Sequence, residues 1–337
     1  MSDKRLGILT GGGDCPGLNA AIRATTKAAM QRGYEVIGIC NGWKGFIDNE
    51  TQALDNTNTS GIIDRGGTIL GTSRFSPTRE ENGVRQVMDA FQKLGLEALV
   101  VLGGHGTLSV TSQMFKLGLP VVGIPKTIDN DIAETDYTIG FQTAVQIATD
   151  ALDRLRSTAE SHHRAMILEV MGNSTGWIAT YAGMANGADA ILIPEIPFNE
   201  EKLDRLCELL QHRIKRGRNF SIIVVAEGTR LEGRPVVVSQ CKGVGEVLGE
   251  AVQEHTGLET RVSVLGYIQR GGTPVAYDRS LAISFGVKAA ELVEKRLYGQ
   301  MVALQGNRVA TVPLAEVEGR VKTVPLDVYR TAEIFFY

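Results

Sequence analysis

Short apolar runs alternate with longer amphipathic segments along most of the chain. Residues 98–102, Ala-Leu-Val-Val-Leu, carry no polar side chain, which is typical of a parallel strand buried on both faces. Such runs predict strands at residues 6–10, 35–40, 98–102, 121–124, 165–170, 190–194, 221–226 and 261–265. Apolar positions three and four residues apart predict helices between them, most clearly at residues 18–31, 140–158, 200–215, 245–255 and 277–298. This alternation predicts an α/β fold with doubly wound parallel sheets.

The length of the chain bears on the number of domains. Its 337 residues fit two doubly wound sheets better than one, so we expect two Rossmann-like domains. No Pro/Ser-rich linker or short repeat interrupts the pattern, so structured chain must cross any domain boundary. The candidate break follows the segment PKTIDNDIAETDYTIG, which ends at residue 140.

The composition argues against several classes of function. The formal net charge is −3 and no basic block stands out, so we expect no nucleic-acid partner. No apolar run approaches the roughly 20 residues of a membrane span, and the first residues lack the apolar region of a signal peptide. We therefore expect a cytoplasmic protein with no membrane partner. The four cysteines form no Cys-x-x-Cys pair, which fits a reducing compartment and argues against a zinc site or a disulfide framework.

Glycine-rich and polar segments follow the predicted strands, at the edge where open α/β sheets bind ligands. GGGDCPG and GGHGT each place uncovered backbone amides between a strand and a helix, an arrangement that binds phosphate. The chain has no GxxxxGK[ST] motif, and a tight turn that needs glycine is the alternative interpretation. His105 is unexpected in such a turn, because the Mg²⁺ that accompanies phosphate prefers oxygen ligands.

Carboxylates and arginines follow other strands. In KTIDND, Asp129 or Asp131 could serve as a general base toward a hydroxyl while the other holds metal or structure, although an Asx-rich turn is an alternative. Glu227 could bind a sugar hydroxyl, and the alternative is a helix cap or a solvated carboxylate. Four arginines near glycine-rich turns or strand starts could bind phosphate: Arg74, Arg164, Arg261 and Arg270.

An ordered set of segments resembles the 6-phosphofructokinase family. The segments are ILTGGGDCPGLNAAIR, DRGGTILGTSRF, GGHGT, PKTIDNDI, DYTIGFQTA, SHHRAMILEVMG, ETRVSVLGYIQRGG and YDRSLA, from about residue 6 to about residue 299. The resemblance implies the phosphofructokinase fold and transfer of a phosphoryl group from ATP–Mg²⁺ to O1 of fructose 6-phosphate, a step of glycolysis. It implies an ATP-binding domain of residues 1–140 plus about 256–305, and a fructose 6-phosphate domain of residues 141–255 plus about 306–337.

The resemblance also implies roles for single residues. Asp129 would be the general base, Thr127 and Asp131 would assist at the transferred phosphoryl group, and Arg74 would stabilise its charge. The residues implied at ATP are Gly12, Arg74, Phe75, Gly104, His105, Gly106 and Thr107. Those implied at the sugar phosphate are Thr127, Asp129, Arg164, Met171, Gly172, Asn173, Glu227, Arg261, Tyr267 and Arg270. Arg164 and Arg261 would reach the phosphate of a neighbouring subunit, which implies a homotetramer with shared sites.

Four positions depart from the family pattern. His105 stands where an aspartate usually holds Mg²⁺ through water, and an imidazole lacks that charge, so slower transfer is expected. Lys126 replaces a glycine and is shared with pyrophosphate-dependent relatives, but those also carry an aspartate at the position of Gly106. Tyr267 replaces a histidine at the sugar phosphate, and Asn173 replaces an arginine.

These departures leave three interpretations open. An ATP-dependent enzyme is favoured by Gly106, a pyrophosphate-dependent enzyme is favoured by Lys126, and a catalytically impaired regulatory subunit is favoured by His105. The possible effector ligands implied by the resemblance are Arg23, Arg156, Arg216 and Arg218. An arginine and an acid common in that effector site are replaced by Asn56 and Gly61. We therefore expect an anionic effector other than ADP, the family's activator, and phosphoenolpyruvate, its inhibitor.

Overall fold

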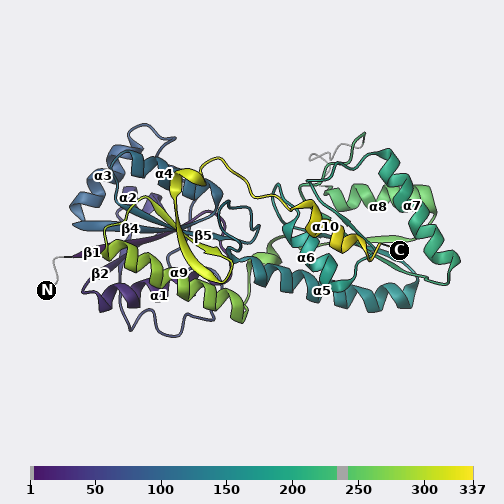
Figure 1. Ribbon diagram of the computed structural model, residues 1–337, viewed down its shortest axis with the longest axis horizontal. Coiled ribbons are helices and arrows are strands. Elements are labelled where there is room, and N and C mark those ends of the chain that lie inside the picture. Colours follow the sequence, from purple (N-terminus) through teal and green to yellow (C-terminus); the bar gives the residue numbers. More distant parts are fainter. Residues whose placement is uncertain (1–3, 234–241, 337) are drawn as a thin grey trace. The chain divides into compact units, whose positions relative to one another are not determined.

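The computed structural model describes residues 4–233 and 242–336, and the chain divides into two compact units. Unit 1 contains Met1–Thr143 and Arg270–Val321, and unit 2 contains Ala144–Gln269 and Lys322–Tyr337. Figure 1 shows an α/β arrangement in each. A strand occurs at each of the eight places that the apolar runs predict, and a helix at each of the five predicted places. The predicted fold class is therefore confirmed.

Unit 1 is built on a mainly parallel sheet in the order β12-β11-β5-β4-β1-β2-β3, with β6 paired to β5. Among the described strands of this sheet, only the outer pairs β2–β3 and β11–β12 are antiparallel. The strands are β1 (Arg5–Gly11), β2 (Glu35–Ile39), β3 (Thr51–Leu54), β4 (Leu96–Gly103), β5 (Val121–Thr127), β6 (Ile139–Gly140), β11 (Gln300–Gln305) and β12 (Arg308–Pro313).

Helices cover both faces of this sheet. They include α1 (Leu18–Gln31), α2 (Lys44–Asp48), α3 (Gly83–Lys93), α4 (His105–Lys116) and α9 (Ala276–Glu294). The helices α1 and α9 pack against each other on one face (Figure 1). Residues of α2, α3 and α4 join the core on the other face with side chains of β4 such as Leu99 and Val101. Because both faces are covered, β4 is buried from Ala98 to its end, which explains its continuous apolar run.

Unit 2 is built on a parallel sheet in the order β10-β7-β9-β8. Its strands are β7 (Ala165–Val170), β8 (Ala190–Leu192), β9 (Ser221–Ala226) and β10 (Thr260–Val264). Its helices include α6 (Trp177–Asn186), α7 (Glu200–Lys215), α8 (Val244–Thr256) and α10 (Leu326–Glu333), and α5 (Phe141–His162) continues into it from unit 1. Side chains of α7 and α8 form a core with one face of β7 and β9. The helix α6 packs against β9, and α10 packs against α6.

The limits of the two units differ from the domain limits that the resemblance implies. Residues 256–269 lie in unit 2, because β10 pairs with β7 along its whole length. Residues 306–321 lie in unit 1, because β12 is the antiparallel partner of β11. The short η3 helix (Leu314–Glu316) follows β12 and packs on α4. Pairing between strands, which local periodicity does not reveal, decides both limits.

Two further findings concern the membrane and the cysteines. No helix within residues 4–233 and 242–336 combines the length and the apolar character that crossing a bilayer requires. Cys15 and Cys40 are free thiols, and Cys241 lies outside the described residues.

Replacing Leu99 by alanine is expected to destabilise unit 1 by about 3 kcal/mol, because a fully buried leucine leaves a cavity when truncated. The leucine is closely packed, since a Cβ at Gly7 would lie only 2.8 Å from Cδ1 of Leu99. Denaturant unfolding followed by circular dichroism measures the change. Leu117 is 54% exposed and provides the control, since its truncation should cost less than about 0.5 kcal/mol. Equal effects of the two variants would contradict this account.

Candidate active site

The glycine turn after β1 packs against the first turn of α4. A Cβ on Gly11 would lie 2.9 Å from Oγ1 of Thr107, and one on Gly12 would lie 3.3 Å from the same atom. Gly12 also has a φ of 78°, a left-handed conformation that favours glycine. The turn therefore requires glycine for structural reasons. The lack of side chains also leaves the backbone amides after β1 uncovered.

The turn after β4 leads directly into α4. Gly104 is the N-cap residue in an extended conformation, and His105 is the first residue of the helix. No side chain in the described part of the chain caps this helix. Gly106 faces open space, since a Cβ there would meet no atom within 4 Å. The first amides of α4 and its partial positive charge are thus accessible to an anion. Nε2 of His105 is buried and has no hydrogen-bond partner among the described residues.

The segment before Arg74 is fixed to the end of β1. Thr72 donates its hydroxyl to the Gly12 carbonyl at 2.6 Å, and Thr10 donates to the Gly71 carbonyl at 2.7 Å. Arg74 itself is exposed, whereas Phe75 is half-buried and packs against the core of unit 1. The structure therefore anchors the backbone of this segment beside the glycine turn and leaves the guanidinium of Arg74 accessible to solvent.

The segment after β5 forms a compact turn around two carboxylates. Oγ1 of Thr127 donates to Oδ2 of Asp129 at 3.1 Å and accepts from the Asp129 amide at 3.1 Å. Asn130, with a φ of 53°, makes the turn by donating to the Asp136 carbonyl and accepting from the Thr138 amide. Asp129 and Asp131 are only 8% and 4% exposed. The bond to the amide two residues on is thus made by the hydroxyl of Thr127, and both carboxylates lie at a buried end of the sheet.

Lys126 forms part of the wall of this site. Its side chain is 1% exposed, and its ammonium group donates to the Gly13 carbonyl. Burial lowers the pKa of Lys126, and Arg270 adds to the effect, while Cys15 and Asp129 oppose it. Arg270 donates to the Asp14 carbonyl at 3.3 Å, and a Cβ on Gly13 would overlap its guanidinium. Unit 1 thus brings the ends of β1, β4 and β5 together with Lys126 and Arg270.

In unit 2, the carboxyl ends of β7 and β9 meet at Glu227. One oxygen of Glu227 accepts from the amides of Gly172 at 3.2 Å and Asn173 at 2.9 Å. Gly172 has a φ of 150° and a Cβ there would overlap the Thr175 carbonyl, so the turn requires glycine. Met171 is half-buried next to this turn, and Tyr267, after β10, is 77% exposed. Glu227 therefore orders the backbone of this edge, which neither sequence interpretation of it foresaw.

Arg164 and Arg261 lie at the amino ends of β7 and β10, opposite the carboxyl ends where Glu227 lies. Both pair with one carboxylate, since Glu259 lies 2.8 Å from Arg164 and 2.5 Å from Arg261. Their guanidinium groups lower the pKa of Glu259, with the hydrogen bond from Arg164 as the largest cause. The sequence analysis missed Glu259, although it lies only two residues before Arg261. Within one chain, these arginines do not join the turn at Met171–Asn173.

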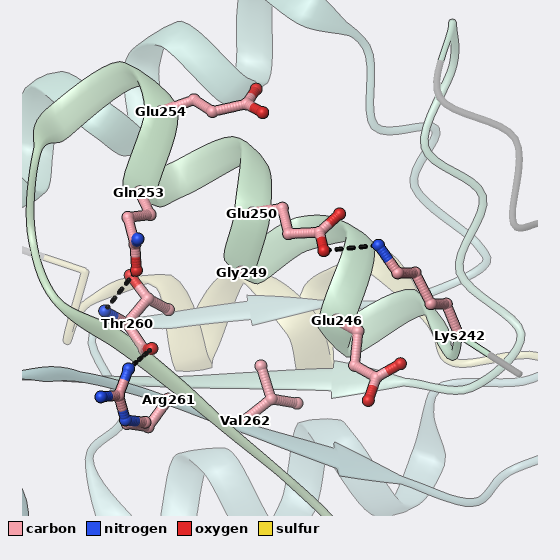
Figure 2. A pocket seen from close by; sticks show the side chains of 9 residues that line it. All are labelled: Lys242, Glu246, Gly249, Glu250, Gln253, Glu254, Thr260, Arg261 and Val262. Atoms are coloured by element: carbon pink, nitrogen blue, oxygen red, sulfur yellow. Dashed lines mark hydrogen bonds and ion pairs between the residues drawn. The ribbon is translucent and has the colours of Figure 1, made fainter. Parts of the chain in front are cut away.

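A pocket of about 720 Å³ lies along α8 and the start of β10, and Arg261 is at its margin. Figure 2 shows Glu246, Glu250 and Glu254 on α8, with Lys242 paired to Glu250. Carboxylates outnumber the cations in this lining, which disfavours a phosphorylated ligand. The pocket therefore does not serve as a sugar-phosphate site built from this chain alone.

The possible effector ligands are distributed as follows. In unit 1, Arg23 donates to the Thr59 carbonyl at 2.5 Å. In unit 2, Arg156 donates to the Asn186 carbonyl at 2.6 Å, while Arg216 and Arg218 are exposed after α7. Asp189 lies near Arg156 and Arg218 and forms an ion pair of 2.8 Å with Arg213. Burial nevertheless raises the pKa of Asp189.

The residues around His105 do not fit a protein-held Mg²⁺. Within residues 4–233 and 242–336, no three His, Cys, Asp or Glu side chains gather as a metal site. Mg²⁺ prefers oxygen ligands in octahedral geometry, whereas position 105 offers only an imidazole nitrogen. A metal in this site would have to take its oxygen ligands largely from the phosphates of a bound donor.

Known proteins resemble this chain over almost its full length. The phosphofructokinase family model matches residues 5–293. A pyrophosphate–fructose 6-phosphate 1-phosphotransferase of Amycolatopsis methanolica is 48% identical over 98% of this chain and 99% of its own length. An ATP-dependent 6-phosphofructokinase of Spirochaeta thermophila is 48% identical over 96% of this chain and 93% of its own length. The crystal structure of Pichia pastoris phosphofructokinase in the T-state superimposes with a TM-score of 0.86 at 33% identity, over 99% of this chain and 37% of that chain.

Proposed function

The chain belongs to the phosphofructokinase family, and we propose that it transfers a phosphoryl group from ATP to O1 of fructose 6-phosphate, giving fructose 1,6-bisphosphate and ADP. Relatives at the same identity are named for either ATP or pyrophosphate, so the choice of donor rests on the chain's own residues. The observation that carries the proposal is the open space at Gly106, at the uncapped N-terminus of α4. A third phosphate and the nucleoside beyond it need that space.

The residues around Asp129 provide the chemistry. Its carboxylate accepts the proton of the sugar O1 while O1 attacks the γ-phosphorus and the bond to the bridging oxygen of ADP breaks. Thr127 orients Asp129 through their hydrogen bond, and Asp131 assists beside it. Arg74 stabilises the charge on the transferred group. The amides of Gly12 and of Gly104–Thr107, with Phe75 beside them, form the phosphate cradle.

The sugar phosphate is assigned to a second set of residues. Glu227 and the turn that it orders, Met171–Asn173, are proposed to bind the sugar hydroxyls. Tyr267 and Arg270 are proposed to bind the 6-phosphate, since a phenol and a guanidinium both donate to phosphate oxygens. Mg²⁺ is proposed to enter with ATP, because the protein offers no carboxylate at position 105.

A pyrophosphate donor is the second candidate, and Lys126 favours it. The buried amine lies beside Gly12, where a Cβ would be 3.8 Å from Nζ, so it could neutralise charge on a short anionic donor. In this structure the amine is already engaged by the Gly13 carbonyl, which supports a role in holding the turn.

Turnover assays with each donor decide between these two candidates. The chain is incubated with fructose 6-phosphate, Mg²⁺ and either ATP or pyrophosphate, and fructose 1,6-bisphosphate is measured directly. Formation with ATP and not with pyrophosphate is the expected result. Formation with pyrophosphate alone would overturn the choice of donor without affecting the family.

Replacing Gly106 by aspartate is expected to raise the KM for ATP about tenfold, because a carboxylate would enter the open space and repel the donor's phosphates. The KM for fructose 6-phosphate should stay within about twofold, since the sugar site uses other residues. Gly106→Ala is the matched control, because it adds a methyl group without charge. An unchanged KM for ATP in the aspartate variant would show that the donor does not use this space.

A catalytically impaired nucleotide- or sugar-phosphate-binding subunit is the third candidate, and His105 favours it. Calorimetry distinguishes it from an enzyme, because such a subunit binds ATP or fructose 6-phosphate without turnover. Asp129, Asp131 and Arg74 are present, which supports slowed transfer over a purely regulatory role.

The proposal includes a homotetramer in the cytoplasm. The position of Arg164 and Arg261, at the edge of their sheet opposite the turn at Met171–Asn173, supports a role in a neighbouring subunit's site. Mass measurement in solution tests the assembly. An anionic effector is proposed for Arg23, Arg156, Arg216 and Arg218, supported by the exposure of Arg216 and Arg218 to solvent after α7.

A further inference from the structure

The motif YDRSLA belongs to the family resemblance, but the reaction described above gives it no task. Its aspartate, Asp278, lies in the first turn of α9 and is completely buried. The carboxylate accepts from the Gly140 amide at 3.0 Å and from the amide and hydroxyl of Thr143 at 2.7 and 2.6 Å. All of these groups lie in unit 1.

The hydrogen bonds to Asp278 compensate for the loss of hydration that burial imposes on a carboxylate. Gly140 and Thr143 carry amides at the start of α5, which the helix itself cannot satisfy. Asp278 therefore lies at the N-termini of two helices, its own and α5, and both dipoles favour negative charge there. Burial raises the pKa of Asp278, while the hydroxyl and amide donors lower it in part. The carboxylate thus ties the start of α9 to the start of α5.

The segment that Asp278 holds is joined directly to the catalytic turn. Gly140 is the partner of Thr127 in the pairing of β6 with β5, and Thr138 donates its hydroxyl to the Thr127 carbonyl at 2.7 Å. On the other side, Sγ of Cys15 donates to the Ile139 carbonyl at 3.2 Å. Gly140, with a φ of 102°, has no room for a side chain against Cys15. Residues 138–140 are therefore fixed from both sides.

We propose that Asp278 is a positioning residue for phosphoryl transfer: by holding Gly140 it fixes Thr127, and through Thr127 it fixes the carboxylate of Asp129. Asp278 touches neither substrate. This inference rests on the proposed function, because it assumes that Asp129 is the general base. A small displacement of a reacting group lowers the rate much more than the affinity, since binding uses many contacts and proton transfer needs one geometry.

The test separates kcat from KM. Asp278→Asn keeps the size of the side chain but replaces one acceptor oxygen by an NH₂ group, which cannot accept from the surrounding donors. We expect kcat to fall about tenfold or more while both KM values stay within about threefold. Thr143→Val removes the hydroxyl that donates to Asp278 and accepts from the Val275 amide, and it should lower kcat about threefold. Thr143→Ser keeps the hydroxyl and should restore the parental kcat. Asp327→Asn is the matched control, because Asp327 lies in the first turn of α10 but is exposed.

The variants are made in the chain itself and in the His105→Asp background, and rates are referred to folded protein measured by circular dichroism. If both backgrounds are inactive with ATP and with pyrophosphate, the proposed function fails. If the parent is active and folded Asp278→Asn keeps its kcat, or changes only KM, the positioning role fails. If Asp278→Asn does not fold, the threonine pair decides: equal kcat values for Thr143→Val and Thr143→Ser overturn the proposal.

Discussion

Replacing His105 by aspartate is expected to raise kcat with ATP about hundredfold, because a carboxylate at this position supplies the negative charge and oxygen that a phosphate-bound Mg²⁺ lacks here. His105 is the first residue of α4, so an aspartate also interacts favourably with the helix N-terminus and should not destabilise the fold. The Mg²⁺ concentration that gives half the maximal rate should fall. Steady-state rates over a series of free Mg²⁺ concentrations measure both effects.

His105→Asn is the control for this prediction. It removes the imidazole and provides an amide oxygen, but it carries no charge, so kcat should rise by no more than about threefold. If asparagine accelerates the enzyme as much as aspartate, the bulk of the imidazole is the cause. If the aspartate variant is no faster at saturating Mg²⁺, the interpretation of position 105 as a place for a metal-associated carboxylate is wrong.

Replacing Asp129 by asparagine is expected to lower kcat about a thousandfold, within the range lost when a general base is removed. The amide retains the shape of the side chain and one oxygen that can accept from Thr127, but it cannot accept the proton of the sugar hydroxyl. The KM for fructose 6-phosphate should change little. The experiment is best done in the His105→Asp background, where a higher starting rate leaves room to measure the loss.

Asp131→Asn is the comparator for Asp129→Asn. Both carboxylates are buried in the same turn, so removing either charge disturbs the same environment. A role for Asp131 that only assists transfer predicts a loss of about tenfold, clearly smaller than that of Asp129. Equal losses would contradict the assignment of the base to Asp129, and a greater loss in Asp131→Asn would transfer the role to Asp131.

Strongly periodic elements could be predicted from the sequence, and others could not. The helix at residues 18–31 was predicted with its observed bounds, because one face of α1 is apolar and the other polar. By contrast, a helix was expected after GGHGT but its bounds were not predicted, because HGTLSVTSQMFK mixes glycine with β-branched residues and α4 also depends on packing against β4 and β5. The helix α6 was missed because its residues are mostly apolar on all sides and show no helical periodicity of apolar and polar positions. This composition is expected for a helix that packs between a sheet and α10.

One missed element did have a local signal. The strands β11 and β12 contain short apolar stretches on either side of Gly306-Asn307, a short turn that is typical of a β-hairpin. Recognising this hairpin would have extended the predicted ATP-binding domain beyond residue 305, closer to the observed end of unit 1 at Val321.

The candidate site was predictable to the extent that it lies at strand ends. Gly12 and Gly104 follow β1 and β4, and Thr127 is the last residue of β5, so their place at one end of a parallel sheet follows from topology alone. The second layer was not predictable. The carboxylate of Asp278 lies over 130 residues from its partners, and Glu227 bonds backbone amides that look alike in any sequence. Such contacts depend on how distant elements pack.

The chain passes between the two units three times, after Thr143, after Gln269 and after Val321. This path has a consequence for synthesis on the ribosome, where the N-terminal residues emerge first. Unit 1 lacks α9 and β11 until the strands of unit 2 have been made. Unit 2 in turn waits for the last residues, where Tyr329 donates its buried hydroxyl to the Ile191 carbonyl at 2.7 Å. Unit 1 can therefore finish folding only after Val321, and unit 2 only after Tyr329, has been translated.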